Sequence, residues 1–137
     1  LDNLKYLDGF CSIRFDRQLD SPKIKADRYL LKVVLSNLLS NAIKFQKHKP
    51  GVTPEIKIRS SISDRLVIEV EDNGEGIQDV YQDRIFEMFY RATTSSSGSG
   101  LGLFIASEAT KKLNGKIYFK TKHGEGSTFT IELPLHE

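Results

Sequence analysis

The sequence predicts an α+β domain in which helices cover one face of an antiparallel or mixed sheet. Several segments alternate charged and apolar residues and are separated by short turns, a pattern typical of hairpin-linked, half-buried strands. The helical segments lie between these hairpins and do not alternate strictly with single strands, as a doubly wound parallel fold would require. We therefore expect a two-layer α/β sandwich with a mostly antiparallel sheet.

Length and composition favour one globular domain. The chain has 137 residues, of which 39% are hydrophobic and 28% charged, close to the averages of globular proteins. The net charge of +2 indicates no global attraction to nucleic acid or to an anionic membrane. No apolar run approaches the roughly 20 residues of a membrane span. We expect a single domain over residues 1–137, cut from a longer chain because the first residue is Leu1.

Apolar residues at three- and four-residue spacing predict the helices. The strongest pattern begins after Asp27 and carries Leu31, Val34, Leu35, Leu38, Ala42 and Phe45 on one face. The predicted helices are 27–46, 101–114, a short one ended by Gly9, and one or two turns within 79–92. Residues 93–100 are small and polar, so we expect a mobile loop there.

Alternation of apolar and polar residues predicts the strands. They are expected at 11–17, 23–26, 55–60, 65–71, 116–122 and 127–133. On the last of these, one face carries Phe129, Ile131 and Leu133, and the other carries Thr128, Thr130 and Glu132.

Three polar residues of the 27–46 helix could meet a metal-bound phosphate. At about 100° per residue, Asn37, Asn41 and Lys44 fall within a stripe ~40° wide that borders the apolar face. Capping of the helix or hydrogen bonds to nearby loops would explain the same stripe.

Two of the three glycine-rich runs also have two interpretations each. Asp72 to Gly76 follows a strand, either as a hairpin turn or as a carboxylate site that a planar ligand can approach. Gly98 to Gly102 leads from a loop into a helix and could be a hinge or an anion site. It lacks the Lys of a Walker A loop and the preceding strand of a Rossmann turn. Gly124 to Gly126 alone indicates a hairpin loop.

The order and spacing of these runs resemble the five conserved boxes of sensor histidine kinases. Residues 37–45 resemble the asparagine box, and residues 85–91 the phenylalanine box. The first, second and third glycine boxes are resembled by residues 72–77, 98–103 and 124–129. The resemblance covers about residues 20–135 and implies the Bergerat ATP-binding fold, a mixed sheet layered against three helices.

The resemblance also implies a role for each residue of the boxes. Asp72 would accept a hydrogen bond from the adenine amino group, with Thr128 nearby, while Asn41 would ligate Mg²⁺ and Lys44 would neutralise phosphate charge. Arg91 is the candidate residue for contacting the γ-phosphate. The other expected nucleotide contacts are Phe45 and Ile77 along the adenine, Gly74 and Gly76 in the turn, and Gly98, Ser99, Gly100, Leu101 and Gly102 at the phosphates.

The implied function is the catalytic, ATP-binding domain of a two-component sensor kinase. It would transfer the γ-phosphoryl group of Mg-ATP to a histidine on a separate dimerisation hairpin, from which a response regulator would take it. The resemblance implies a homodimeric parent, which can be membrane-anchored, and a cytoplasmic catalytic domain without membrane or nucleic-acid contacts. No histidine here fits the acceptor motif, so we expect no autophosphorylation by the isolated chain.

Two other hypotheses about the function of the chain remain open. Hydrolytic Bergerat ATPases place a glutamate base one helical turn before the magnesium asparagine, where this chain has Asn37, and an amide cannot take a proton from water. That difference favours the kinase, whose expected catalytic residues are Asn37, Lys44 and Arg91. The second hypothesis is a degenerate domain that binds a nucleotide, or only partner proteins, and catalyses no reaction. A serine kinase of the anti-sigma type would also share the fold.

Overall fold

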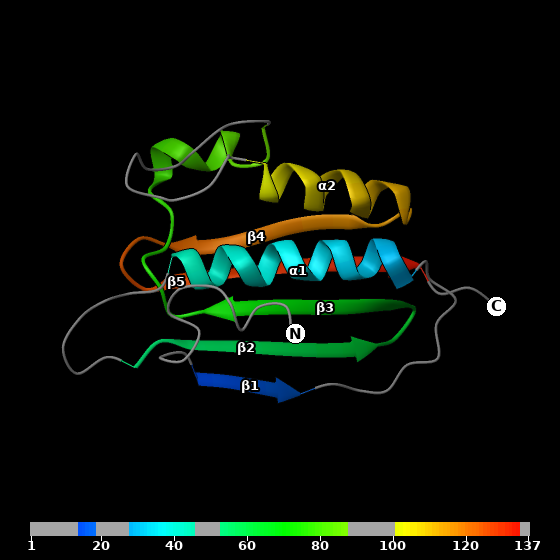
Figure 1. Ribbon diagram of the computed structural model, residues 1–137, viewed down its shortest axis with the longest axis horizontal. Coiled ribbons are helices and arrows are strands. Elements are labelled where there is room, and N and C mark those ends of the chain that lie inside the picture. Colours follow the sequence, from blue (N-terminus) through cyan, green and yellow to red (C-terminus); the bar gives the residue numbers. More distant parts are fainter. Residues whose placement is uncertain (1–13, 19–27, 46–52, 88–100, 135–137) are drawn as a thin grey trace.

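The computed structural model describes residues 14–18, 28–45, 53–87 and 101–134, which form a sheet with helices packed on one face (Figure 1). The strands are β1 (Arg14–Gln18), β2 (Glu55–Ile62), β3 (Arg65–Asp72), β4 (Lys116–Lys122) and β5 (Gly126–Pro134). The helices are α1 (Arg28–Lys44), α2 (Gly102–Lys112) and the short 3-10 helix η3 (Asp79–Arg84).

The sheet is mixed and mostly antiparallel, as the sequence predicts. Its five strands lie in the order β1-β2-β3-β5-β4. Among the strands in the described ranges, only β1 and β2 are parallel, and the other three neighbouring pairs are antiparallel. A parallel pair needs a crossover connection, and α1 lies in the stretch of chain that joins β1 to β2.

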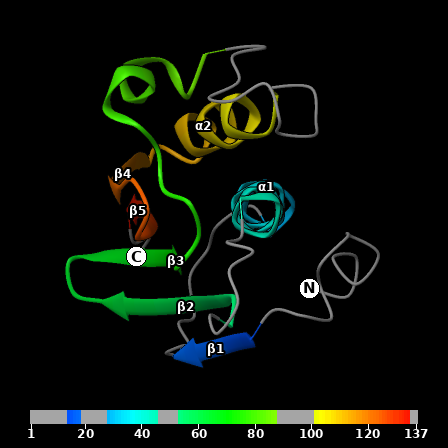
Figure 2. The ribbon, with the colours of Figure 1, turned by 90° about the vertical axis from the view of Figure 1, so that its left-hand side faces the viewer.

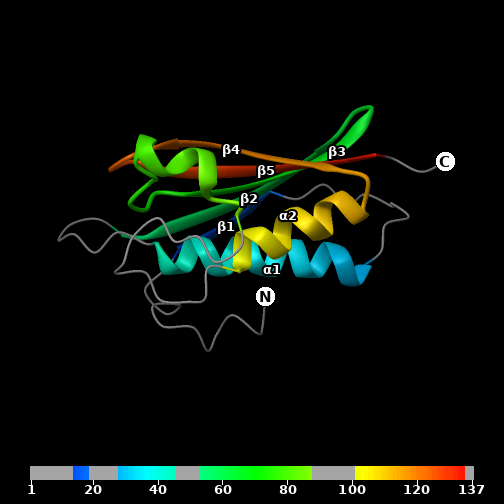
Figure 3. The same ribbon diagram turned by 90° about the horizontal axis from the view of Figure 1, so that it is seen from above.

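Both α-helices lie on the same face of the sheet and pack against each other (Figures 2 and 3). The buried residues of α1 are Val34, Leu38, Leu39, Ala42 and Ile43. The predicted apolar stripe therefore extends to Leu39 and Ile43, while Leu31 and Leu35 are only half-buried. The stripe is wider than expected because α1 contacts α2 as well as the sheet.

The central strand β3 shows the strictest alternation. Leu66, Ile68 and Val70 are buried towards the helices. Their partners on β5 are Leu133, Ile131 and Phe129 in that order, so two apolar rows meet in the core. The next inward position of β3 is Asp72, and the apolar row therefore ends in a carboxylate that is only 8% exposed.

The predictions of the remaining helices are confirmed in part. The expected helix over 101–114 is α2, and the expected turns within 79–92 include η3, which lies beyond the β4 edge near the start of α2 (Figures 1 and 2). Three predicted segments lie outside the described residues: the helix ended by Gly9, the strand 23–26 and the loop 93–100. None of the helices in the described ranges has the length and hydropathy needed to cross a bilayer.

Candidate functional site

Asp72 is the acidic centre of the candidate site, at the end of β3. Its Oδ1 accepts a hydrogen bond from the Gly74 backbone N–H at 2.9 Å. Burial raises the pKa of the Asp72 carboxyl to about 6; the backbone amides of Gly74 and Ser127 oppose this rise, and the charge of Glu71 adds to it. No cationic side chain in the described ranges forms an ion pair with Asp72. The site thus contains a buried acceptor that is mostly ionised at neutral pH.

The end of α1 is fixed directly against the turn that follows Asp72. The carbonyl oxygen of Phe45 accepts a hydrogen bond from the Glu75 backbone N–H at 3.0 Å. A Cβ on Gly74 would lie only 2.2 Å from the same oxygen, so a side chain there would force the two segments apart. The last turn of α1, which carries Asn41 and Lys44, is consequently held at this end of the sheet.

The β4–β5 hairpin closes the other side of the turn. The Gly124 backbone N–H donates to the Glu75 carbonyl at 2.6 Å. Gly76 has a φ of +71°, and a Cβ there would lie 2.2 Å from the Lys122 carbonyl oxygen. The segment from Asp72 to Ile77 therefore passes between α1 and the hairpin, with glycine where the backbones approach most closely.

Two hydroxyl groups join this turn to the hairpin. The Ile77 backbone N–H donates to Thr121 Oγ1 at 2.9 Å. Thr121 Oγ1 lies 2.8 Å from Ser127 Oγ, and Ser127 is the direct cross-strand partner of Asp72. Direct partners in an antiparallel pair point to the same face, so the Ser127 side chain lies beside the Asp72 carboxylate.

This register corrects the expectation that Thr128 accompanies Asp72. Thr128 pairs with Glu71 and points to the opposite, open face of the sheet. Neither Ser127 nor Thr121 was among the candidate residues. The alternation of the last strand contained the signal for Ser127, because Phe129 and Ile131 face the core and Ser127 shares their parity.

The polar stripe of α1 runs from this turn towards the start of α2. Asn37 Nδ2 donates to the Val33 carbonyl at 2.8 Å, and its Oδ1 lies 3.4 Å from where a Cβ on Gly102 would stand. From Asn37 to Phe45 the helix rises about 12 Å. Asn41 is half-buried and Lys44 is exposed between those ends.

The first turn of α2 offers backbone N–H groups near Asn37. Its N-cap residue, Leu101, makes no side-chain capping hydrogen bond. The first amides of an α-helix have no partner within the helix, and its dipole favours an anion at this end. Arg91, Gly98, Ser99 and Gly100 lie outside the described residues, so their expected part in the site stays a prediction.

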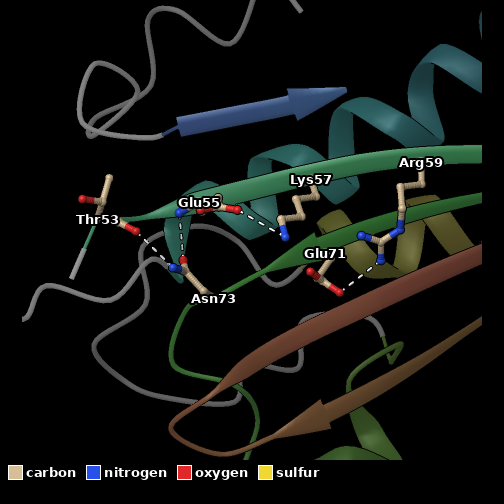
Figure 4. Close-up of polar contacts among 6 residues, drawn as sticks. All are labelled: Thr53, Glu55, Lys57, Arg59, Glu71 and Asn73. Carbon is tan, nitrogen blue, oxygen red and sulfur yellow. Dashed lines mark hydrogen bonds and ion pairs between the residues drawn. The ribbon is translucent and has the colours of Figure 1, made fainter. Parts of the chain in front are cut away.

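Asn73, the second residue of the turn, binds β2 and not the site. Its Oδ1 accepts from the Glu55 backbone N–H at 2.8 Å, and its Nδ2 donates to the Thr53 carbonyl at 3.0 Å (Figure 4). Its own backbone N–H donates to the Glu55 carbonyl at 3.3 Å. These bonds continue the β2–β3 ladder past the end of β3 and fix where the turn begins.

The arrangement suits a ligand with a hydrogen-bond donor at one end and an anionic group at the other. Asp72 and Ser127 provide oxygen acceptors at the turn, while Lys44 and the start of α2 provide positive potential. The Asn41 amide oxygen is a hard donor of the kind that Mg²⁺ accepts, and magnesium sites commonly combine one or two protein oxygens with phosphate oxygens and water. The donor set thus fits a magnesium-bound phosphate ligand.

A family model described as "Histidine kinase-, DNA gyrase B-, and HSP90-like ATPase" matches residues 26–137. The alginate biosynthesis sensor protein KinB of Pseudomonas aeruginosa is 34% identical over 124 residues, covering 90% of this chain and 20% of that protein. The sensor histidine kinase AruS of Pseudomonas aeruginosa is 40% identical over 110 residues, covering 77% of this chain and 11% of that protein. The chain thus spans a fifth or less of the length of these relatives.

Solved structures agree with the sequence comparisons. A mycobacterial sensor histidine kinase, MprB, superposes with a TM-score of 0.78 at 26% identity, covering 92% of this chain and 84% of that one. The catalytic domain of histidine kinase ThkA gives 0.75 at 28% identity, covering 98% and 84%. The fold class and the family resemblance predicted from the sequence are confirmed.

Proposed function

Because this chain belongs to the family of histidine kinase-, DNA gyrase B- and HSP90-like ATPases, we propose that it binds Mg²⁺-ATP as the catalytic domain of a sensor histidine kinase. The γ-phosphoryl group is transferred to a histidine on a separate dimerisation domain, and a response regulator receives it afterwards. The single domain proposed over residues 1–137 is one part of a larger kinase, which acts as a homodimer.

The burial of Asp72 is the observation that carries the proposal. A carboxylate that is 8% exposed, with a pKa of about 6 and no cationic partner among the described residues, is costly for the fold. Such a group is better explained by a ligand than by stability. As a pure acceptor when ionised, it matches the amino group of adenine.

The other proposed contacts follow the length of the nucleotide. Phe45 and Ile77, both half-buried beside the turn, flank the adenine with Gly74 and Gly76. Asn41 holds Mg²⁺, and Lys44 neutralises phosphate charge. The backbone amides around Leu101 and Gly102 bind phosphate oxygens, and Arg91, Gly98, Ser99 and Gly100 are proposed to complete that end.

Phosphoryl transfer depends mainly on positioning and charge neutralisation, and these residues supply both. Bound Mg²⁺ would offset the negative charge of the phosphates. Asn37 is neutral, and its amide already donates to the Val33 carbonyl. It therefore orients without acting as a base towards water, which favours transfer to an external acceptor over hydrolysis.

Calorimetry tests nucleotide binding. We expect the domain to bind ATP with Mg²⁺ and ADP to compete, and Asp72→Asn to weaken binding at least about tenfold, because an amide can present a donor to the adenine amino group. Glu71→Gln is the matched control, since its side chain lies on the opposite face. Absence of binding by the wild type, or equal binding by Asp72→Asn, would contradict the proposal.

Phosphotransfer needs a second experiment. The domain is mixed with a histidine-bearing dimerisation domain and labelled ATP, with each domain alone as the control. We expect acid-labile label on the added domain only. Rapid hydrolysis of ATP by the catalytic domain alone would favour the ATPase alternative, and binding without transfer to any such domain would favour the hypothesis of a degenerate domain.

A further inference from the structure

We propose that Thr121 determines which purine the site accepts, by fixing the Ser127 hydroxyl as a hydrogen-bond acceptor beside Asp72. This inference rests on the proposed function and specifies the base within the same site. Thr121 is a positioning residue here, because it acts through Ser127.

Thr121 is surrounded by three hydrogen-bonding groups, one from the turn after β3 and two from the start of β5. The Ile77 backbone N–H donates to its Oγ1 at 2.9 Å. Its hydroxyl donates to the Gly126 carbonyl at 3.1 Å. Its Oγ1 also lies 2.8 Å from Ser127 Oγ, where either group could be the donor.

Only one assignment of the protons makes all three contacts hydrogen bonds. A hydroxyl has one proton to donate and two lone pairs that accept. If the single Thr121 proton were directed to Ser127, the Gly126 contact would have no proton, so we assign the Thr121 proton to the Gly126 carbonyl. The hydrogen bond between the two hydroxyls must then use the Ser127 proton, and Ser127 Oγ keeps its lone pairs.

The consequence is a pair of acceptors at one end of the site. Ser127 and Asp72 are direct cross-strand partners, and both side chains face the helices. Asp72 accepts hydrogen bonds from the backbone amides of Gly74 and Ser127, and an ionised carboxylate has about four lone-pair sites, so it can still accept from a ligand. Two neighbouring acceptors match the two hydrogens of a purine 6-amino group, directly or through a water, and repel the carbonyl oxygen of a 6-oxopurine.

The position of Thr121 also couples the base to the turn. Thr121 pairs with Ser127 across β4 and β5, and it is half-buried on the same face. The hydrogen bond from Ile77 to Thr121 connects a residue that is proposed to flank the adenine with the acceptor pair Asp72 and Ser127. Loss of the hydroxyl would free the Ser127 proton, because Ser127 could then rotate and donate to a ligand carbonyl.

Base discrimination is the measurement that separates this role from simple stability. Affinities of ADP and of inosine diphosphate, which carries a 6-oxo group, are compared by calorimetry for wild type, Thr121→Val and Thr121→Ser. We expect Thr121→Val to bind inosine diphosphate several-fold more tightly than wild type, lowering the preference for ADP by about tenfold. Thr121→Ser retains a hydroxyl and should keep the preference of the wild type.

Thr110→Val is the matched control for a lost buried threonine hydroxyl. Thr110 donates only to the Ala106 carbonyl of its own helix, near the end of α2 that lies away from the Asp72 turn (Figure 1). This variant should leave the ratio of the two affinities unchanged. Folding of each variant is checked by thermal unfolding before titration.

The outcomes are distinct. An unchanged ADP preference in Thr121→Val, or an equal loss of affinity for both nucleotides, overturns the role of Thr121 while leaving nucleotide binding intact. A Thr121→Ser variant that behaves like Thr121→Val also overturns it. Failure of the wild type to bind either nucleotide overturns the proposed function itself, and this inference with it.

Discussion

Two adjacent carboxylates on β3 lie in opposite environments. Glu71 faces the open side of the sheet, where its Oε1 lies 3.0 Å from Arg59 Nη2 (Figure 4). Asp72 faces the helices, where it is buried, has no cationic partner in the described part of the chain, and has a raised pKa. On the open face, the charge of Glu71 is paired with Arg59. On the helix-facing side, the charge of Asp72 is not neutralised by any described side chain and is available to a ligand.

The two carboxylates differ in how they affect the stability of the folded state. The open-face ion pair is partly solvated and contributes little to stability. The buried carboxylate opposes folding when ionised, which is typical of a functional group rather than a structural one. Variants on the two faces should therefore change stability by different amounts and, for the carboxylates, in different directions.

The largest expected effect lies in the core of the helix-facing side. Ile131→Ala removes a side chain that is 0% exposed and should lower the free energy of unfolding by about 3–4 kcal/mol. Val67→Ala, on the half-buried open face of β3, should cost less than about 1 kcal/mol. Urea unfolding of both variants measures the contrast, and similar losses would mean that the two faces are buried alike.

Asp72→Asn should have the next largest effect and the opposite sign. The Asp72 pKa rises from 3.8 to about 6 on folding, so the native state binds the proton more tightly and loses stability as pH rises between these values. Without ligand, the variant should be about 3 kcal/mol more stable than wild type at pH 8, with the gain vanishing below about pH 4.

Denaturant unfolding across this pH range measures the difference, with Glu71→Gln as the control that shows no such gain. Parallel pH profiles for Asp72→Asn and wild type would mean that Asp72 is not desolvated. Binding of adenine nucleotides should weaken as pH falls through about 6 in the wild type, and this component should be absent from Asp72→Asn.

Asn73→Ala should lower the free energy of unfolding by about 1–2 kcal/mol, because two side-chain hydrogen bonds to the start of β2 are lost. Asn73→Asp keeps an acceptor for Glu55 N–H but places a carboxylate against the Thr53 carbonyl. It should therefore recover only part of the stability that Asn73→Ala loses. Glu75→Ala, an exposed side chain of the same turn, is the control. A neutral Asn73→Ala variant would show that backbone pairing alone fixes the turn.

The smallest effect is expected from Arg59→Gln on the open face. Removing its pairs with Glu71 and Glu69 should change the free energy of unfolding by less than about 1 kcal/mol. The change should shrink further at high salt, because the pairs are partly exposed. A loss of several kcal/mol that does not depend on salt would indicate that this face is covered rather than open.

Local patterns were sufficient for the elements of the fold. Alternation in residues 65–71 predicted β3, and helical spacing after Asp27 predicted α1, because burial on one face imposes a period within each element. The glycine runs marked the turns where backbones approach, as Gly74 and Gly76 show. Each of these signals depends on residues close together in the chain.

The composition of the site depended on contacts between distant segments. Asp72 is marked by the sequence as a turn carboxylate, but its burial and raised pKa arise only in the folded sheet, where it pairs with Ile56 of β2 and Ser127 of β5. Strand register placed Ser127 beside it and turned Thr128 to the other face, since a shift of one residue reverses the side of the sheet. Thr121 became a partner of Ile77, 44 residues earlier, only when β4 was packed beside the turn. Periodicity fixes which face a residue takes within its own element, whereas pairing between elements decides which side chains meet there.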